Sequence, residues 1–452
     1  MGFYLNSVKP AELYNNETKR PYFVDKTRML EELFPLVDTG TQYVCITRPR
    51  RFGKTIMANM IGAFFGKSKE LPIFERLEIA KAPDYKKYKH QYNVVYIDFS
   101  KVNTDCESYS EYIAYIKDIL RDDLHEAFPD VRYRQRGDAA EDFMRITQST
   151  GEKFIFVFDE WDYIFHRNYV TDDDKARYVA FLSNLLKDQP YVKLVYMTGI
   201  LPITKYSSGS ELNMFKEYTM NTQSLYSDYF GFTEKEVDEL YARYRTNNKE
   251  LRVDREGLRK WYDGYHTLTG KQLYNPRSIV FALENNQLSD YWTSSGPYDE
   301  IFYYVKNNIA DVRNDIAKMV AGESVPAEIQ EYSATSSELK TRAEILSAMV
   351  VYGFLTFDNG CVSIPNRELM NKFSDMVKKE ESLGYIYRLA KESDRMLAAT
   401  KAGDVDTMVS ILQHAHDTET GMTGYNDESE LSVECKVEVL AERIEEMRIS
   451  TR

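Results

Sequence analysis

Short apolar runs recur along the first half of the chain, and stretches with helical spacing of apolar residues separate them. The apolar runs lie at residues 43–47, 94–99, 154–158 and 194–198. Residues 109–128 are one of the separating stretches, with apolar residues spaced as on one face of a helix. Continuous apolar runs that alternate with helices are typical of the buried strands of a parallel sheet. The sequence therefore predicts an α/β fold, with a short fifth strand at 216–220, but it does not give the order of the strands.

The pattern changes after about residue 228. Helical segments dominate from a Thr cap at Thr233 to about residue 330. A helix over 341–352 then precedes a hairpin whose turn is Asp358-Asn359-Gly360, and this order predicts a winged-helix-like α+β region. We expect five parts: an α/β core at 1–228, a helical lid at 229–330, the winged-helix-like region at 331–370, a helical connector at 371–425, and a C-terminal part at 426–452.

The first apolar run leads into a loop that ends in Gly-Lys-Thr and continues as a helix-like segment, 56–65. Strand, loop and helix in this order are the context of a P-loop, in which backbone N–H groups at a helix N-terminus bind phosphate. Lys54 would reach the β- and γ-phosphates of a nucleotide, and the Thr55 hydroxyl would bind Mg²⁺. The loop residues expected to contact the nucleotide are Arg48, Pro49, Arg50, Arg51, Phe52, Gly53, Lys54, Thr55 and Ile56.

This loop departs from the common P-loop pattern. Arg48 stands where that pattern has its first glycine, and Pro49 stiffens the turn. The guanidinium groups of Arg48, Arg50 and Arg51 could add bidentate phosphate contacts. A Gly-Lys-Thr tripeptide can also occur by chance, so a second motif is needed.

The run at residues 154–158 supplies it, because it ends in Asp159 and Glu160. Acids at the carboxyl end of a parallel strand lie where such sheets bind ligands. Asp159 would hold Mg²⁺, and Glu160 would deprotonate the attacking water. Thr198, at the end of another predicted strand, would sense the γ-phosphate; a Thr that caps the turn before Gly199 is the alternative. The two acids could also be an ordinary solvated strand end.

Composition argues against several classes of protein. The net charge is −13, which does not support broad binding of DNA. No run of 18 apolar residues is present, so no membrane span is expected. The four cysteines are scattered, which argues against a disulfide framework or zinc site and favours the cytoplasm.

With these motifs the chain resembles the bacterial AAA-ATPase-like family, of the signal-transducing P-loop ATPase clade, that is usually fused to a C-terminal PD-(D/E)XK nuclease-like domain. The resemblance spans about residues 8–431. It depends on strings that begin at Tyr22, Arg48, Asp159, Thr198, Trp261, Tyr274 and Ile364.

The resemblance implies roles for several residues. Lys54 and Thr55 match the Walker A residues of the family, and Asp159 and Glu160 match its Walker B residues. It also implies that Pro276 approaches the nucleotide from the lid and that Arg277 could reach the γ-phosphate, although a surface arginine after a turn is favoured for Arg277 because exposed arginine is the rule. ATP and Mg²⁺ are therefore the expected cofactors.

The C-terminus departs from the family pattern. Residues 426–432 resemble the start of the nuclease-like domain, but too few residues follow for its metal-binding acids. Glu434-Cys435-Lys436 has the spacing of a nuclease metal strand by coincidence, and a charged helix over 437–448 fits better. The nuclease-like domain is thus expected to be truncated.

Two functions are compatible with the sequence. The first is a Mg²⁺-dependent ATPase that acts as a regulatory switch. The second is a nucleotide-binding module without turnover that engages a partner protein or DNA through its C-terminal regions. The partner, including a second copy of this chain, is left open.

Overall fold

The computed structural model describes residues 2–67, 71–102, 105–203, 211–221, 224–292, 312–329, 339–379, 395–397 and 399–411. The chain divides into two units, residues 1–380 and 381–452. In the second unit, the described side chains of Met396, Ala399, Met408 and Ile411 form a small apolar cluster. The predictions for residues 412–452, including the truncated nuclease-like part, lie outside the described residues.

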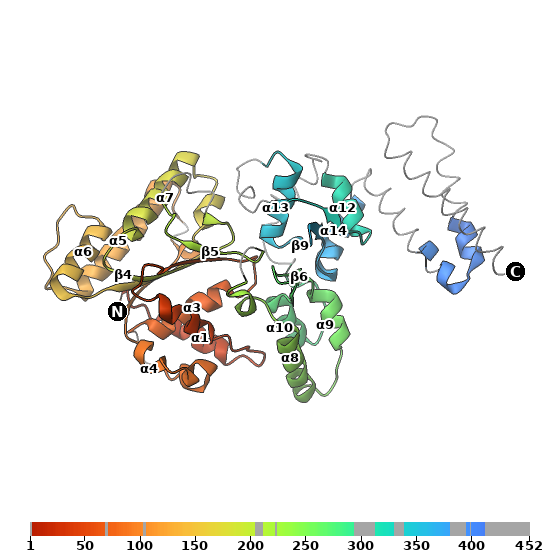
Figure 1. Cartoon of the computed structure of the whole chain (residues 1–452), viewed down its shortest axis with the longest axis horizontal. Coiled ribbons are helices and arrows are strands. Elements are labelled where there is room, and N and C mark those ends of the chain that lie inside the picture. The colour runs from red at the N-terminus through yellow and green to blue at the C-terminus, as the bar shows by residue number, and fades with distance from the viewer. Residues whose placement is uncertain are drawn as a thin grey trace. The chain divides into compact units, whose positions relative to one another are not determined.

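The core of the first unit is a five-stranded parallel sheet (Figure 1). Its strands are β1 (Tyr43–Thr47), β2 (Asn93–Asp98), β3 (Phe154–Asp159), β4 (Val192–Gly199) and β5 (Lys216–Tyr218). The order across the sheet is β2-β3-β4-β1-β5, which places β4 between the P-loop strand and the strand that ends in Asp159. All five predicted strands are confirmed, and the fold is that of an α/β P-loop NTPase.

Alternate residues of these strands face two separate apolar cores, as the two-residue period of a strand requires. Along β3, Phe156 and Phe158 face one core, while Ile155 and Val157 face the other. Helices cover both faces of the sheet, so the strands are apolar on both sides (Figure 1).

One helical layer contains α1 (Lys9–Thr18), α2 (Met29–Leu33), α3 (Lys54–Phe65) and α4 (Tyr85–Tyr88). The opposite layer contains α5 (Tyr109–Ala127), α6 (Ala139–Thr150) and α7 (Asp172–Leu186). Thr171 starts α7 with a capping box to Asp174, which satisfies N–H groups that the first turn leaves free.

The region after the sheet is mainly helical. It contains α8 (Glu234–Asn247), α9 (Arg255–Tyr262), the short β6–β7 hairpin (Tyr265–His266 and Gln272–Leu273), α10 (Pro276–Asn285) and α12 (Val312–Val320). The predicted Thr233 cap is confirmed, because its side chain accepts a hydrogen bond from the Glu236 N–H. Apolar residues of α8, α9 and α10 form a core of their own.

The predicted helix and hairpin follow. They are α13 (Arg342–Tyr352), β9 (Thr356–Asp358) and β10 (Cys361–Ser363), and β10 also pairs with β8 (Val325–Pro326). The chain continues as α14 (Arg367–Lys379). Because residues 330–338 are outside the described part, the winged-helix assignment stays a prediction.

Candidate nucleotide-binding site

The loop between β1 and α3 has the backbone geometry of a phosphate-binding turn. Gly53 has a φ of +90° and precedes the first helical residue, Lys54. Arg51 also has a positive φ, +70°, which is costly for a residue with a Cβ and is typical of functional loops. Thr55 and Ile56 are exposed at the N-terminus of α3, where backbone N–H groups lack helical partners.

Lys54 is buried within the loop. Its Nζ donates hydrogen bonds to the carbonyl oxygens of Arg48, at 3.1 Å, and of Pro49, at 3.2 Å. The ammonium group is therefore held inside the turn by neutral acceptors. A phosphate would be a stronger, charged acceptor for the same group.

Asp159 ends β3 and is fully buried. Its Oδ1 accepts a hydrogen bond from the Glu160 N–H at 3.1 Å. Burial raises the pKa of Asp159 to about 8, and the negative charges of Glu160 and Asp98 add to this. A hydrogen bond from Thr55 and the charge of Lys54 oppose the shift. The lysine and threonine of the loop thus lie beside this carboxylate, as the sequence predicts for a magnesium site.

Glu160 follows with a φ of +52°, a conformation rare for glutamate. Burial raises the pKa of its carboxyl group, and Lys54 lowers it. Asp162 and Asp98 raise this pKa further, whereas the positive charge of Arg50 lowers it. Both predicted Walker B acids therefore lie in the field of the phosphate loop.

Asp98 is a third acid at this edge that the sequence analysis did not select. It ends β2 directly opposite Asp159 in the register of the two strands. Its Oδ1 accepts hydrogen bonds from the Ser100 N–H, at 3.0 Å, and from the Ser100 hydroxyl, at 2.6 Å. The signal was in the sequence, since Asp98 ends an apolar run just as Asp159 does.

Thr198 lies near the end of β4 and pairs with Ile46 of β1. Its side chain is fully buried, and its Oγ1 has no hydrogen-bond partner among the residues that the structure describes. A buried hydroxyl without a partner costs about 1–3 kcal/mol, and a phosphate oxygen or a water molecule at this position would satisfy it. Among the described residues this oxygen makes no capping hydrogen bond, and both the γ-phosphate contact and the turn cap stay predictions for Thr198.

Asp162 fixes the loop that follows Thr198. Its Oδ2 accepts hydrogen bonds from the N–H groups of Ile200, at 3.0 Å, and Leu201, at 2.8 Å. A Cβ on Gly199 would lie 2.5 Å from Asp162 Oδ1 and 2.5 Å from a ring carbon of Trp161, so only glycine fits there. Sequence reasoning missed this role, which follows from the neighbouring positions of β3 and β4.

Arg48, at the start of the loop, makes structural contacts with two strands of the sheet. Arg48 is buried, and its Nη1 donates hydrogen bonds to the carbonyl oxygens of Thr47 and Tyr218, each at 2.7 Å. Its guanidinium also lies 5.1 Å from the ring centre of Phe230. This group therefore ties β1 to the end of β5, and its contact with phosphate stays a prediction.

The predicted lid residues lie at the start of α10. Asn275 accepts a hydrogen bond from the Ser278 N–H at 3.2 Å, and Pro276 occupies the first turn. The Arg277 guanidinium lies 4.5 Å from the ring centre of Phe281 on the same helix. The nucleotide contacts proposed for Pro276 and Arg277 remain predictions.

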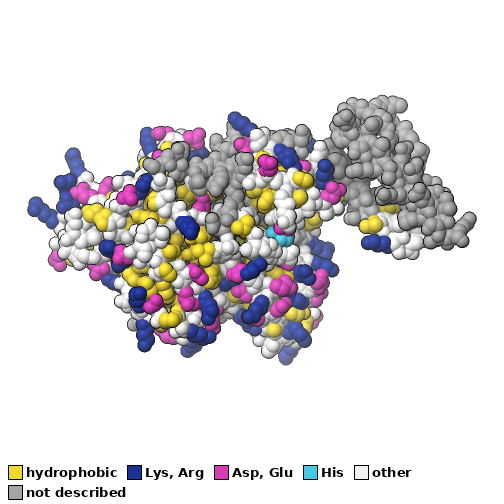
Figure 2. Space-filling model, viewed as in Figure 1, with side chains coloured by type: hydrophobic (Ala, Val, Ile, Leu, Met, Phe, Trp, Pro, Cys, Tyr) yellow, Lys and Arg dark blue, Asp and Glu magenta, His cyan; other side chains and the backbone are white. Residues whose placement is uncertain are grey.

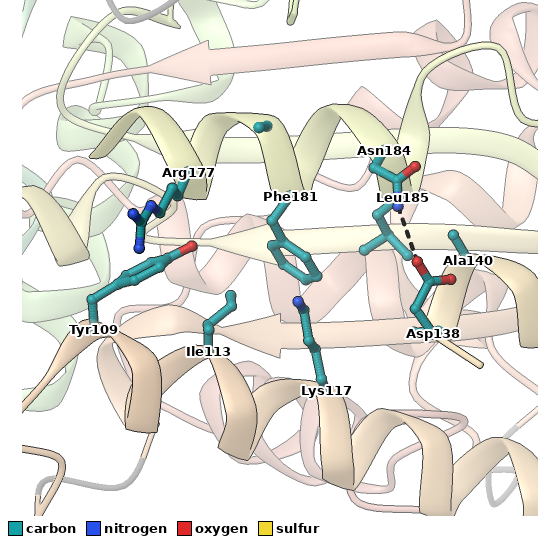
Figure 3. A pocket seen from close by; sticks show the side chains of 11 residues that line it. Tyr109, Ile113, Lys117, Asp138, Ala140, Arg177, Phe181, Asn184 and Leu185 are labelled. Carbon is teal, nitrogen blue, oxygen red and sulfur yellow. Dashed lines mark hydrogen bonds between the residues drawn. The ribbon is translucent and has the colours of Figure 1, made fainter. Parts of the chain in front are cut away.

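A groove of about 370 Å³ lies elsewhere, between α5 and α7 (Figure 3). Its lining includes Tyr109, Ile113, Lys117, Arg177 and Phe181, and no residue of the phosphate loop or of the strand ends. Lys117 and Phe181 point toward each other across it, with the ammonium 5.2 Å from the ring centre. The groove is thus separate from the candidate site.

Magnesium fits the residues present. Mg²⁺ is usually held by one or two protein oxygens, with phosphates and water as its other ligands. The adjacent side chains of Thr55 and Asp159 supply such a pair. Among the described residues, no three His, Cys, Asp or Glu side chains form a group that could hold a metal ion by themselves. No described helix is long and apolar enough to cross a membrane.

Comparisons with known proteins agree with this geometry. Residues 14–208, less than half of the chain, match the model of the AAA-ATPase-like family, described as "Predicted AAA-ATPase". The chain is 27% identical over 281 residues to an "Uncharacterized protein in vnfD 5'region" of Azotobacter chroococcum mcd 1. That alignment covers 61% of this chain and 51% of the relative, so the chain spans about half of the relative's length.

The solved structures similar to this chain share less sequence with it than the relative from Azotobacter chroococcum mcd 1 does. A Walker-type ATPase of Pyrococcus abyssi is 12% identical with a TM-score of 0.42, and the match covers 77% of this chain and 94% of that one. The ORC2 protein of Aeropyrum pernix is 10% identical with a TM-score of 0.38, covering 80% and 92%. The family match and the observed sheet support an AAA-ATPase-like chain; none of these comparisons shows the C-terminal nuclease fusion.

Proposed function

We propose that this chain binds ATP with Mg²⁺ at the β1–α3 loop and hydrolyses it, as a nucleotide-driven switch. The observation that carries the proposal is the meeting of three distant segments at one edge of the sheet. These are the Lys54–Thr55 turn, the Asp159–Glu160 strand end and the unpartnered hydroxyl of Thr198. Parallel strands bring such groups together because all their carboxyl ends share one edge.

The chain's own groups divide the work of binding. The N–H groups at the start of α3 and the Lys54 ammonium would hold the phosphates, and Arg50 and Arg51 would add positive charge beside them. Thr55 and Asp159 would hold Mg²⁺, which when bound neutralises charge on phosphate oxygens. Binding of Mg²⁺ would also place a cation beside the buried Asp159 carboxylate, whose neighbours Glu160 and Asp98 are negatively charged.

Glu160 is the proposed general base. Burial raises the pKa of its carboxyl group, which makes it a stronger base than an exposed glutamate, and Lys54 and Arg50 oppose that rise. It would accept a proton from the attacking water. Thr198, whose buried hydroxyl has no hydrogen-bond partner among the described residues, would donate to a phosphate oxygen or orient that water.

The switch would act through the regions that follow the sheet. The helical lid and the helix–hairpin region would change position with the nucleotide, and Pro276 and Arg277 would contact it from the lid. A partner protein, a second copy of this chain or DNA would then respond in the cytoplasm. The charge of −13 favours a protein over DNA among these partners.

Phosphate release by wild type and Glu160→Gln tests the proposal. Glu160→Gln should bind Mg²⁺-ATP and lose turnover by at least about 100-fold, because it keeps the shape and loses the base. The control is Glu256→Gln, which alters an exposed glutamate of α9 and should leave turnover unchanged. Tight binding without turnover in wild type would replace the ATPase by the non-hydrolysing interaction module, or by an enzyme that waits for its partner.

A further inference from the structure

The phosphate loop is packed, on Phe52, against a segment more than 200 residues away in the sequence. The rings of Phe52 and Tyr265 meet edge to face, with their centres 4.9 Å apart, and each residue is 1% exposed. Tyr265 belongs to the β6–β7 hairpin of the lid. Its hydroxyl donates a hydrogen bond to the carbonyl oxygen of Gly353 at 3.1 Å.

Gly353 brings the end of α13 against the same loop. It has a φ of +83°, and a Cβ at this position would lie 2.6 Å from the Cβ of Pro49. Val350 and Val351 of α13 line, with Pro49 and its neighbours, a cavity of only about 20 Å³. The end of α13 therefore leaves almost no free space beside Pro49.

The two distant segments are also joined to each other. The His266 N–H, next to Tyr265, donates a hydrogen bond to the Thr356 hydroxyl of β9 at 2.9 Å. A Cβ on Gly264 would overlap the carbonyl oxygen of Pro365, at 1.9 Å, so the backbones touch there as well. The β6–β7 hairpin and the helix–hairpin region consequently meet the loop as one packed surface.

The loop itself links this surface to the phosphate site. The Pro49 carbonyl oxygen is an acceptor for Lys54 Nζ at 3.2 Å, and the Arg48 guanidinium anchors the loop entry to β5. Arg51, which lies between Pro49 and Lys54 in the sequence, has a costly positive-φ conformation. A phosphate would compete with the Pro49 carbonyl for Lys54, so the ligand and the distant segments act on the same peptide.

We propose that Tyr265 and Gly353 are positioning residues that set the conformation of the phosphate loop through Phe52 and Pro49. The coupling rests on the proposed function and adds its route: nucleotide binding changes the packing of α13, and the packing of α13 changes nucleotide affinity. By linkage, the same coupling free energy applies in both directions. Neither residue needs to touch the nucleotide.

Tyr265→Phe tests the route, because it keeps the ring on Phe52 and removes the hydroxyl that donates to the Gly353 carbonyl oxygen. The matched control is Tyr241→Phe, which removes a lid hydroxyl that donates to the Val253 carbonyl oxygen at 3.4 Å. The dissociation constant for a non-hydrolysable Mg²⁺-ATP analogue should rise about 3- to 10-fold in Tyr265→Phe and stay unchanged in the control. Gly353→Ala, which drives a methyl group toward Pro49, should raise it further.

Hydrogen exchange over α13 distinguishes coupling from a purely structural role of Tyr265, because a structural role would not change how this exchange responds to the analogue. In wild type, the analogue should alter amide exchange over residues 342–352; in Tyr265→Phe at saturating analogue, that response should be lost. Saturable binding with unchanged exchange over 342–352, or wild-type affinity in both Tyr265→Phe and Gly353→Ala, would overturn the coupling and leave the ATPase proposal standing. No analogue binding by wild type would overturn both.

Discussion

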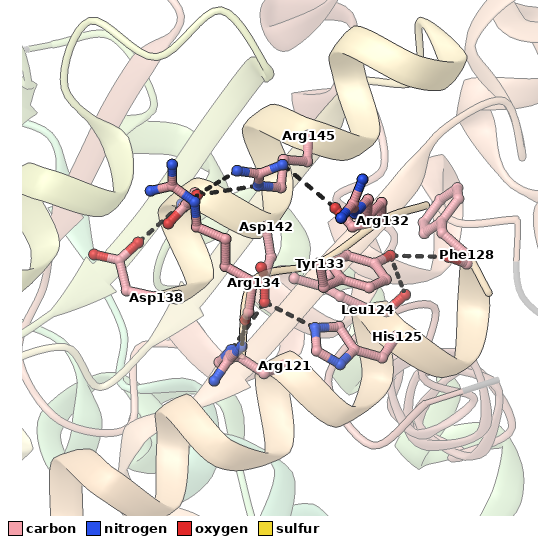
Figure 4. A network of polar contacts seen from close by, with 11 residues as sticks. Arg121, Leu124, His125, Phe128, Arg132, Tyr133, Arg134, Asp138, Asp142 and Arg145 are labelled. Atoms are coloured by element: carbon pink, nitrogen blue, oxygen red, sulfur yellow. Dashed lines mark hydrogen bonds and ion pairs between the residues drawn. The ribbon is translucent and has the colours of Figure 1, made fainter. Parts of the chain in front are cut away.

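Two fully buried carboxylates of this chain, those of Asp142 and Asp159, have very different neighbouring side chains. Asp142, on α6, shares its Oδ2 between Arg121 Nε and His125 Nε2, each at 2.9 Å (Figure 4). Asp159, at the end of β3, has Glu160 and Asp98 as its charged neighbours and Lys54 as the opposing cation. One buried acid is paired with an arginine and hydrogen-bonded to a histidine, and the other has two acids and one lysine beside it.

The network around Asp142 holds α5, α6 and the loop between them together. Arg121 also donates to the Arg134 carbonyl oxygen at 3.1 Å, and the Tyr133 ring stacks on His125 with ring centres 3.8 Å apart. Figure 4 shows Arg121 and His125, both on α5, converging on the Asp142 carboxylate of α6. The charge of Asp142 is opposed by an arginine within the fold, whereas the charge of Asp159 is opposed by Lys54 and disfavoured by two neighbouring acids, and we propose that Mg²⁺ would add to its compensation. The comparison separates an acid that holds two helices together from an acid that we propose is functional.

The largest expected effect concerns the structural acid. Asp142→Ala should lower the free energy of unfolding by about 3 kcal/mol, because it leaves Arg121 partly buried without its carboxylate. Urea denaturation would measure the change. Glu141→Ala, which removes the neighbouring and more exposed partner of Arg145, should cost less than about 1 kcal/mol. Equal losses in the two variants would show that burial does not distinguish these acids.

Removing the charge of Asp159 should have the opposite effect on stability, in protein without bound nucleotide or metal. The pKa of Asp159 is about 8 in the folded state and about 4 in an unfolded chain. Between these values the folded protein retains a proton that the unfolded chain has lost, so stability falls as pH rises from about 4 to about 8. One retained proton contributes at most about 1.4 kcal/mol per pH unit.

Asp159→Asn should therefore reduce this pH dependence and raise stability at pH 8, while it weakens Mg²⁺-dependent ATP binding. Unfolding curves from pH 5 to pH 8 would measure it. Asp173→Asn removes an exposed acid of α7 and serves as the control. If wild type and Asp159→Asn lose stability with identical slopes, the account of Asp159 is wrong.

Two buried threonines give the smallest expected difference in stability. Thr27 Oγ1 donates a hydrogen bond to Asp25 at 2.6 Å and accepts one from the Ile79 N–H at 3.1 Å, whereas Thr198 Oγ1 has no hydrogen-bond partner in the described part of the chain. Thr27→Val should cost about 1–2 kcal/mol, and Thr198→Val should be neutral or slightly stabilising. Thr198→Val should also lower the rate of ATP hydrolysis at saturation with little change in affinity. A Thr198→Val enzyme with the wild-type rate would exclude its proposed role.

The sequence predicted the parts of this molecule that local pattern determines. Apolar runs predicted all five strands, and the Thr233 cap and the Asp358-Asn359-Gly360 turn each depend on a few adjacent residues. The positions of Asp159 and Thr198 at one edge followed because parallel strands end together.

Sequence could not give what depends on strand order and on packing between distant segments. Asp98 becomes part of the site only because β2 lies beside β3 in register. Asp162 holds the loop after β4 because these strands are neighbours, and Gly353 abuts Pro49 through a contact across 304 positions. No periodicity encodes such contacts, since they depend on the whole arrangement of the chain.

The central claim is that the β1–α3 loop binds ATP with Mg²⁺, and titration of Mg²⁺-ATP into wild type and Lys54→Ala tests it most directly. Lys260→Ala, which removes an exposed lysine of α9, is the matched control. The account predicts saturable binding by wild type and Lys260→Ala, with an affinity at least about 100-fold weaker in Lys54→Ala, since the loop then lacks its charge-assisted phosphate contact. Equal affinity in all three proteins would contradict it.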